Sequence, residues 1–256
     1  LRHDGPEHVM AFALTRSGKG VGLVIPTLRS WTGSAVIHDI KGENWQLTAS
    51  WRSKFSQCIY FNPADPRSAR FNPLLEVRRG FNEERDVRNI ADILVDPEGR
   101  LDTFNHWQAT AHALLTGTIL HVLYAKEEKS LAAVARLLSD PSRPIERTLY
   151  EMLTTNHIGT SDEPQVHPTV AKSARQLFNM SENERSGVVS TANTYLARFA
   201  EPIMGEVTSA CDWRIGNLVS AAKPVSLYLV VPPSDTANAK PLIRLILNQI
   251  GRRLTE

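Results

Sequence analysis

Cysteine is scarce in this chain of 256 residues: the two present, Cys58 and Cys211, lie far apart and neither belongs to a C-x-x-C pair. This argues against a zinc site and favours reduced thiols in a cytosolic compartment. The eight histidines show no H-E-x-x-H or comparable ligand spacing, so they predict no metal site either. His106, His112 and His121 fall in one predicted helix, where packing and local hydrogen bonding are the expected roles.

Long hydrophobic runs and a strong net charge are also missing. No signal peptide is visible, and no run reaches the length of about 18 apolar residues that spans a membrane. The nearest candidate, Thr110–Tyr124, contains His112 and His121 and predicts a buried helix. The formal net charge of +2 is too small to predict nucleic-acid binding, so any DNA contact must come from local patches or from oligomerisation. The hydrophobic content of 42% is typical of a soluble globular protein.

The most informative segment is Val9–Gly22, with the sequence VMAFALTRSGKGVG. It predicts a buried strand over Val9–Leu14, a loop of small residues that closes on Gly18-Lys19, and then a helix. This layout is typical of a phosphate-binding loop, in which backbone N–H groups and a helix N-terminus surround a phosphate and the lysine reaches the terminal phosphates. The predicted cradle comprises Thr15, Arg16, Ser17, Gly18, Lys19, Gly20 and Val21.

The loop departs from the general pattern G-x-x-x-x-G-K-[S/T] at two positions, Ala13 and Gly20. A glycine-rich turn with an incidental lysine is the alternative interpretation. The hydroxyl expected at position 20 normally coordinates Mg²⁺, and glycine offers no side-chain oxygen. A bound Mg²⁺ would therefore need water and carboxylate ligands, with Asp39 the first candidate and Ser17 or Thr15 weaker ones.

A second apolar run, Ser34–Asp39, ends in a carboxylate and is followed by Lys41-Gly42-Glu43. Strand, loop, helix and strand in succession predict a right-handed βαβ unit, whose ligands bind at the carboxyl ends of its strands. Asp39 and Glu43 are therefore candidate catalytic residues beside the phosphate site, together with Lys19. The alternative is that Asp39 only caps the helix that follows.

Strand and helix signals alternate from residue 9 to about 75, with a third strand predicted over Cys58–Phe61. From about 82 to 208 the pattern is helical throughout, and the α/β pattern then returns with a buried strand over Val225–Val231 and a helix over Pro241–Leu254. The helices of the middle block are predicted over Glu83–Val95, Thr103–Lys126, Ser130–Ser139, Ile145–Leu153, His167–Met180 and from Ser181 to about Ala200. Such a block implies an insertion into a nucleotide-binding domain, with domain boundaries at 1–80, 81–208 and 209–256.

Several separate motifs in this order resemble one family, the TraG/TraD-type coupling proteins of conjugative type IV secretion systems. They are Thr15–Gly22, Ile25-Pro26, His38–Asn44, Phe71–Leu74 and Ser226–Asp235, and the resemblance covers nearly the whole chain. In that family glycine is usual after the lysine. The resemblance implies an α/β fold, namely a RecA-like P-loop NTPase domain with a mostly parallel sheet, helices on both faces and an inserted all-α domain.

The resemblance further implies a ring-forming ATPase that uses ATP and Mg²⁺ to drive DNA or protein substrates through a secretion channel. Its partners would be relaxase-bound DNA or secreted effector proteins, other type IV secretion components, and copies of itself in a hexameric ring. Its place would be the cytoplasmic face of the bacterial inner membrane. Members carry a membrane anchor before this region and an Asp-Glu pair on a strand after it, so we expect the domain to be incomplete at both ends and this segment alone to be inactive.

A second hypothesis is a recognition module in which the helical block docks DNA or effectors and nucleotide is only a structural ligand. A small-molecule kinase is disfavoured, because the helical insertion is far larger than a usual substrate lid. Arg185 is a candidate for contact across a ring interface, against the alternative of an ion pair with a neighbouring glutamate. The pairs Arg78-Arg79 and Arg252-Arg253 are candidates for contact with a DNA backbone, against the alternative of solvated faces.

Overall fold

A parallel three-stranded sheet organises the α/β part of the computed structural model, which describes residues 9–12, 14, 17–100 and 103–255. The strands are β1 (Ala35–Asp39), β2 (Gln57–Phe61) and β3 (Val225–Val230). Their order is β1-β3-β2, so the last strand in the sequence lies at the centre, and every residue of β3 is buried. Parallel strands need crossover connections: α2 (Glu43–Arg52) connects β1 to β2, and the long helical segment after β2 leads to β3 between them. The three predicted strands after residue 30 are thereby confirmed.

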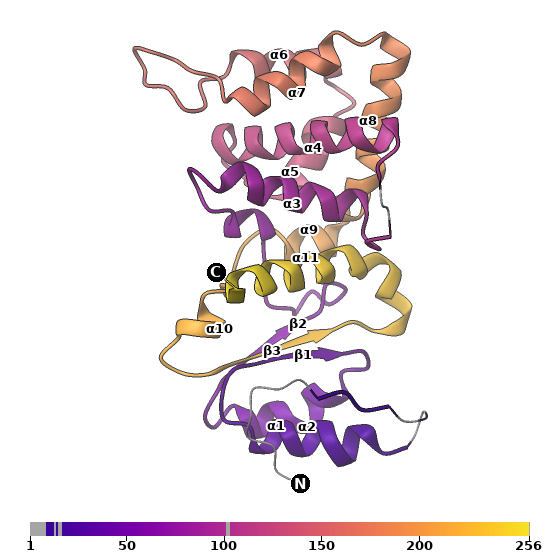
Figure 1. Ribbon diagram of the computed structural model, residues 1–256, viewed down its shortest axis with the longest axis vertical. Helices are drawn as coiled ribbons and strands as arrows, with labels where there is room; N and C mark the ends of the chain where they lie inside the picture. Colours follow the sequence, from indigo (N-terminus) through magenta and orange to yellow (C-terminus); the bar gives the residue numbers. More distant parts are fainter. Residues whose placement is uncertain (1–8, 13, 15–16, 101–102, 256) are drawn as a thin grey trace.

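Different helices cover the two faces of the sheet (Figure 1). The helix α1 (Ile25–Ser30), continuous with the π-helical turn η1 (Gly20–Val24), lies with α2 on one face, where Ile37, Tyr228 and Val230 are buried. The helix α11 (Thr236–Thr255) lies on the opposite face, where Leu227 and Leu229 join the larger core. Successive strand residues point to opposite faces, and because helices cover both faces, every residue of β3 is buried.

The remaining helices stack in layers away from the sheet (Figure 1). Next to α11 lies α3, followed by α4 with α5 and then by α6 with α7, while α8 returns along one side of the stack. The α-helices are α3 (Glu83–Val95), α4 (His106–Ala125), α5 (Leu131–Ser139), α6 (Ile145–Thr154), α7 (Pro168–Phe178), α8 (Glu182–Leu196), α9 (Pro202–Val207) and α10 (Asn217–Ser220). Short 3-10 turns are η2 (Pro73–Glu76), η3 (Ala197–Ala200) and η4 (Pro233–Asp235).

Side-chain caps explain where several of these helices begin. Asn105 and Gln108 form a capping box that starts α4, and Ser130 accepts a hydrogen bond from the Ala133 N–H at the start of α5. Ser181 accepts from the Glu184 N–H at the start of α8. The six predicted helices of the block are confirmed, with ends that differ by a few residues where such caps act.

The helix α4 is the centre of the stack. From Leu114 to Leu123 every residue is buried, including His121 at 0% exposure. The predicted buried helix over Thr110–Tyr124 is thus confirmed. None of the helices in the described part of the chain combines the length and the hydrophobicity that a membrane span requires.

Two local predictions are wrong. The described residues of Val9–Leu14 form no strand, and their apolar side chains are exposed, with Phe12 at 88% and Leu14 at 86%. No neighbouring strand pairs with them in the described part of the chain, so their backbone lacks the ladder that defines a strand. The last helix begins at Thr236 rather than Pro241, so Pro241 stands inside it. A proline cannot donate to the Ala237 carbonyl four residues earlier, and that carbonyl accepts a hydrogen bond from Arg198 at 3.3 Å instead.

Candidate nucleotide-binding site

The predicted phosphate loop leads directly into a helix. Gly18 has φ +86°, in the left-handed region that favours glycine, and η1 starts at Gly20. The Gly22 N–H donates to the Gly18 carbonyl at 2.7 Å, which closes the first turn. Thr15 and Arg16 of the predicted cradle, and Ala13 before it, lie outside the described residues. In Figure 1 the helix starts on the side to which the strand arrows point, which is where parallel sheets bind ligands.

Lys19 is exposed and bends back over the loop. Its Nζ donates a hydrogen bond to the Leu14 carbonyl at 2.9 Å. An ammonium group that bonds a loop carbonyl exchanges this partner for a phosphate at small cost, because both are oxygen acceptors and the group stays in contact with water. The role of Lys19 on the β- and γ-phosphates remains a prediction.

Asp39 ends β1 and is buried, at 3% exposure. Its Oδ2 accepts a hydrogen bond from the Trp45 N–H at 2.8 Å, so the carboxylate stabilises the first turn of α2. Gly42 makes the sharp entry into that helix with φ +73°, and Glu43 follows as its exposed first residue. The structure therefore contains the contact expected if Asp39 caps the helix that follows it. The catalytic roles of Asp39 and Glu43 remain predictions.

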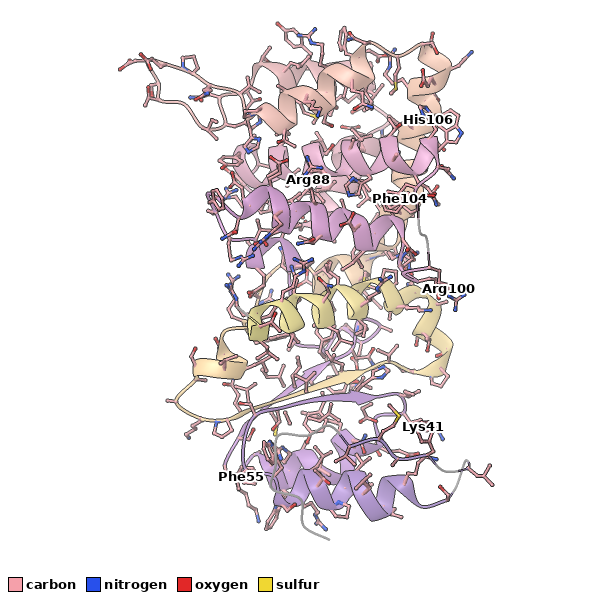
Figure 2. All side chains as sticks on the ribbon, viewed as in Figure 1. Lys41, Phe55, Arg88, Arg100, Phe104 and His106 are labelled. Atoms are coloured by element: carbon pink, nitrogen blue, oxygen red, sulfur yellow. The ribbon has the colours of Figure 1, made fainter. Side chains whose placement is uncertain are left out.

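A cleft of ≈ 500 Å³ opens at the carboxyl ends of the three strands. Lys41, labelled in Figure 2, stands beyond the end of β1 on its rim. Trp45 and Tyr60 form an aromatic wall, with 5.1 Å between ring centroids, and the ring of Trp45 also packs on the buried Tyr228 at 5.2 Å. The lining residues are Lys41, Gly42, Trp45, Gln46, Tyr60, Asn62, Arg67, Val230 and Pro232.

A chain of hydrogen bonds holds the β2 side of this cleft. The Asn62 amide donates to the Tyr60 hydroxyl at 3.1 Å, and that hydroxyl donates to Asp65 at 3.2 Å. Hydrogen bonds from Arg67 lower the pKa of Asp65 to about 2, and burial raises the pKa of Tyr60. Because Arg67 is paired with the Asp65 carboxylate at 2.8 Å, Lys41 is the lining residue that adds positive charge beside these ordered polar groups, which suits an anionic ligand.

Sequence reasoning did not select Tyr60, Asn62 or Arg67 as site residues. The signal that identifies them is their place in the chain, since Tyr60 and Asn62 lie at the end of β2 and Arg67 in the turn that follows. The carboxyl ends of parallel strands meet at one edge of the sheet, so the residues after each strand converge there.

Arg185 is already engaged within the chain. Its guanidinium contacts Glu146 of α6 at 2.6 Å, and its side chain is 13% exposed. The partner is on another helix, not a neighbouring glutamate of α8. Within the chain, Arg185 thus serves as an ion-pair partner that connects α8 to α6.

The fold and the loop define a class: a P-loop NTPase domain of the RecA-like kind, with a parallel sheet between helices and a helical insertion. The model of the family "Type IV secretory system Conjugative DNA transfer" matches residues 1–256, and the chain belongs to this family. It is thus a coupling protein of conjugative transfer. The conjugal transfer protein TraG of Escherichia coli is 46% identical over 264 residues, covering 100% of this chain and 41% of the relative. VirD4 of Agrobacterium fabrum is 28% identical over 263 residues, covering 98% of this chain and 36% of the relative.

Solved structures support the fold. The plasmid coupling protein TrwB in complex with ADP and Mg²⁺ superposes with a TM-score of 0.58 at 18% identity, covering 92% of this chain and 50% of that one. TrwB with the non-hydrolysable ATP analogue ADPNP gives a TM-score of 0.59 at 21% identity, covering 91% and 49%. The chain spans about two fifths of the length of the curated relatives it matches, as the 41% coverage of TraG shows.

Proposed function

We propose that this chain is the ATP-binding motor segment of a coupling protein that recruits DNA or protein substrates and moves them by ATP hydrolysis. The observation that carries the proposal is the loop at Gly18–Gly22: a left-handed glycine and an exposed lysine at the start of a helix, on the ligand-binding side of a parallel sheet. TrwB, which shares the fold, was solved with ADP and Mg²⁺.

In this proposal ATP occupies the loop, with Lys19 on its β- and γ-phosphates and the backbone from Thr15 to Val21 as cradle. Mg²⁺ fits the site through water and the carboxylate of Asp39, because Gly20 offers no side-chain ligand. The hydrogen bond from the Trp45 N–H occupies Asp39 Oδ2, and the second carboxylate oxygen would be the one that holds the metal. Subunits of a ring would act together on relaxase-bound DNA or effector proteins at the inner membrane. The domain boundaries at residues 80 and 208 belong to the same proposal.

The test is nucleotide binding and turnover in the intact protein. We expect Lys19→Ala to weaken ATP binding at least about 10-fold and to abolish turnover, because it removes the charge that faces the terminal phosphates. Lys223→Ala, which removes an exposed lysine in the turn before β3, is the matched control and should leave both unchanged. Turnover by Lys19→Ala at the wild-type rate would refute the motor assignment. Substrate docking without any turnover by the wild type would leave the recognition module as the better account.

A further inference from the structure

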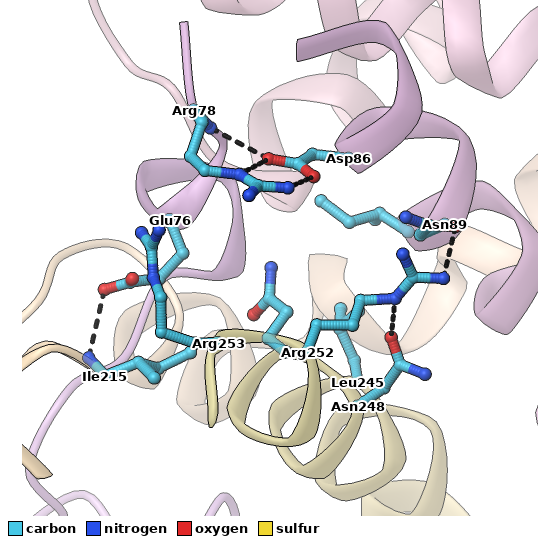
Figure 3. Close-up of a pocket in the computed structure, with 11 residues that line it drawn as sticks. Glu76, Arg78, Asp86, Asn89, Ile215, Leu245, Asn248, Arg252 and Arg253 are labelled. Carbon is cyan, nitrogen blue, oxygen red and sulfur yellow. Dashed lines mark hydrogen bonds and ion pairs between the residues drawn. The ribbon is translucent and has the colours of Figure 1, made fainter. Parts of the chain in front are cut away.

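A narrow cleft between α3, α11 and η2 brings together arginines from the two basic pairs, which lie far apart in the sequence. Arg78 comes from the segment before α3, and Arg252 and Arg253 come from the last turns of α11 (Figure 3). The space inside is ≈ 40 Å³, which has room for about three water molecules.

The acidic residues of the cleft are already neutralised. Asp86 accepts two hydrogen bonds from the Arg78 guanidinium, at 2.8 and 2.6 Å, and the pair lowers the pKa of Asp86 although burial opposes this. Glu76 lies 3.6 Å from Arg214 and accepts from the Ile215 N–H at 3.4 Å. Both carboxylates are thus held by an arginine each.

Arg252 and Arg253 remain without a carboxylate partner among the described residues. Arg252 donates to two amide oxygens, Asn248 Oδ1 at 3.1 Å and Asn89 Oδ1 at 2.8 Å, which orient its guanidinium (Figure 3). Arg253 is exposed at the rim. Two uncompensated guanidinium groups on one cleft attract an oxyanion, and their planar forks match phosphate geometry.

The cleft also contains polar atoms without partners. Asn89 Nδ2, a donor, and Gln249 Oε1, an acceptor, are buried and make no hydrogen bond in the described part of the chain. Buried polar groups normally have partners, because an unmade bond costs free energy. A phosphate oxygen at the floor of the cleft would accept from Asn89, and a bridging water would serve Gln249.

An exposed aromatic residue follows Arg78 closely in the sequence. Phe81 is 102% exposed and follows Arg78 by three residues, so its Cα lies within about 10 Å of the Cα of Arg78. An exposed phenylalanine next to arginines is the pairing that single-stranded nucleic acids use, with bases stacked on the ring and phosphates held by guanidinium groups.

We propose that this cleft binds the phosphodiester backbone of single-stranded DNA, with Arg252 and Arg253 on a phosphate and Phe81 stacked on an adjacent base. The site is separate from the nucleotide loop, which lies on the other side of the sheet. The inference deepens the proposed function, on which it rests, by naming where the DNA substrate is held. Free phosphate offers the same anion but no base for Phe81.

The test measures binding of a labelled oligothymidylate of about 20 nucleotides to the intact protein across a range of salt concentrations. The double variant Arg252→Ala/Arg253→Ala should bind about 10-fold more weakly, and the magnitude of the slope of log K against log salt should fall by about 1.4, which is about 0.7 for each arginine on a single strand. Arg252→Lys/Arg253→Lys should restore most of the slope. Lys172→Ala/Arg175→Ala removes the same charge from the exposed side of α7 and should bind like the wild type.

Phe81→Ala should weaken binding by about 10-fold at every salt concentration, and Phe81→Tyr should retain it. ATP binding should be unchanged in all these variants, which also shows that they fold. Oligonucleotide affinity of the Arg252/Arg253 double variant equal to that of the α7 control would overturn the proposal and leave the motor assignment intact. If inorganic phosphate displaces the oligonucleotide but Phe81→Ala has no effect, the cleft is a free-anion site and the DNA assignment is wrong. Absence of ATP turnover in the wild-type protein would instead count against the proposed function, whatever the cleft binds.

Discussion

The Nε of Arg52 donates a hydrogen bond to the hydroxyl of Ser226 at 2.7 Å, inside the domain and with both residues at 0% exposure. The same guanidinium donates to the carbonyls of Leu28 and Trp31, at 2.7 and 2.6 Å, and of Gly33, at 2.8 Å. One side chain of α2 thus ties the end of α1 to the central strand. Because α1 continues from the phosphate loop, this contact holds the helix that carries the candidate site.

Replacing Arg52 should therefore be costly. We expect Arg52→Lys to lower the free energy of unfolding by about 3 kcal/mol, because one ammonium group cannot reach acceptors on several sides and leaves buried carbonyls unsatisfied. Arg29→Lys, an exposed substitution on α1, should change it by less than about 0.5 kcal/mol. Urea unfolding followed by circular dichroism gives both values. Equal stabilities for the two variants would mean that the buried network contributes nothing.

Asp39→Asn separates a capping role from a catalytic one. The amide oxygen still accepts from the Trp45 N–H, so the free energy of unfolding should fall by less than about 1 kcal/mol. If the carboxylate also holds Mg²⁺, the ATPase rate of the intact protein should fall 10- to 100-fold. The measurement is steady-state turnover at several Mg²⁺ concentrations. An unchanged rate would assign Asp39 to the helix alone.

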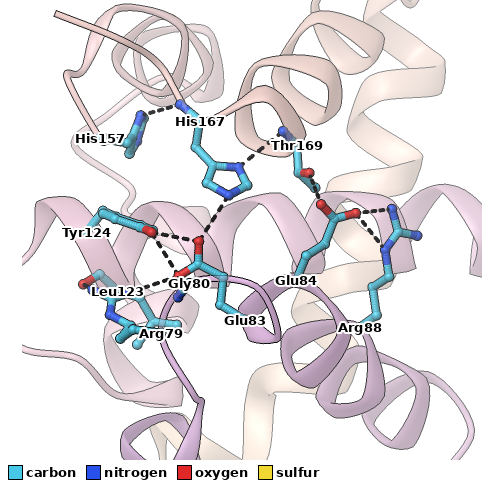
Figure 4. A network of polar contacts seen from close by, with 10 residues as sticks. All are labelled: Arg79, Gly80, Glu83, Glu84, Arg88, Leu123, Tyr124, His157, His167 and Thr169. Carbon is cyan, nitrogen blue, oxygen red and sulfur yellow. Dashed lines mark hydrogen bonds and ion pairs between the residues drawn. The ribbon is translucent and has the colours of Figure 1, made fainter. Parts of the chain in front are cut away.

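The buried histidines of the stack predict a pH dependence of stability. His121 lies 2.9 Å from His157, between their ring nitrogens, and burial lowers the pKa of His121 to about 4 and also lowers the pKa of His157. The ring of His157 in turn accepts a hydrogen bond from the backbone N–H of His167. The Nε2 of His167 lies 3.4 Å from Oε1 of Glu83 (Figure 4). The rings of His121 and His157 are therefore buried in the neutral form.

Because His121 is buried in its neutral form, the unfolded chain binds more protons at this residue than the folded chain does between pH 6.5 and 4. The stability is fully present above pH 6.5 and is lost as the pH falls toward 4, by about 2 kcal/mol for His121 alone between pH 7.5 and 5. Glu151, whose pKa is lowered to about 2, acts below this window. Urea unfolding at both pH values should show the loss in the wild type and a smaller one in His121→Gln. A loss of the same size in His121→Gln would exclude this residue as the source.

The close contact of α4 with α7 depends on Gly117. A Cβ at this position would lie 2.5 Å from both the Cβ and the Oγ of Ser173. We expect Gly117→Ala to lower the free energy of unfolding by about 2 kcal/mol, since the clash outweighs the helix propensity that alanine adds. Adding Ser173→Gly should recover about 1 kcal/mol of this loss despite its own cost. Strict additivity in the double-mutant cycle would show that the helices separate without strain.

Local signals located most elements well. Glu83–Val95 matches its predicted bounds because its apolar side chains repeat at helical spacing and Pro97 ends the pattern. The apolar run Val9–Leu14 carried a strand signal of equal strength, but a strand also needs a neighbour for its backbone, and the described sheet offers none.

Sequence by itself determined the phosphate-loop motif, the succession of strands and helices and the family, because these depend on residues that are close together in the chain. Only the tertiary structure decided that Arg52 meets Ser226 and that Arg78 shares a cleft with Arg252 and Arg253. Such contacts follow from the strand order and from how the helices pack. These bring together residues that are far apart in the sequence, such as Arg52 and Ser226, which are 174 positions apart. Local sequence patterns do not predict contacts between residues that far apart in the chain, so only the packing of the folded core shows which of them meet.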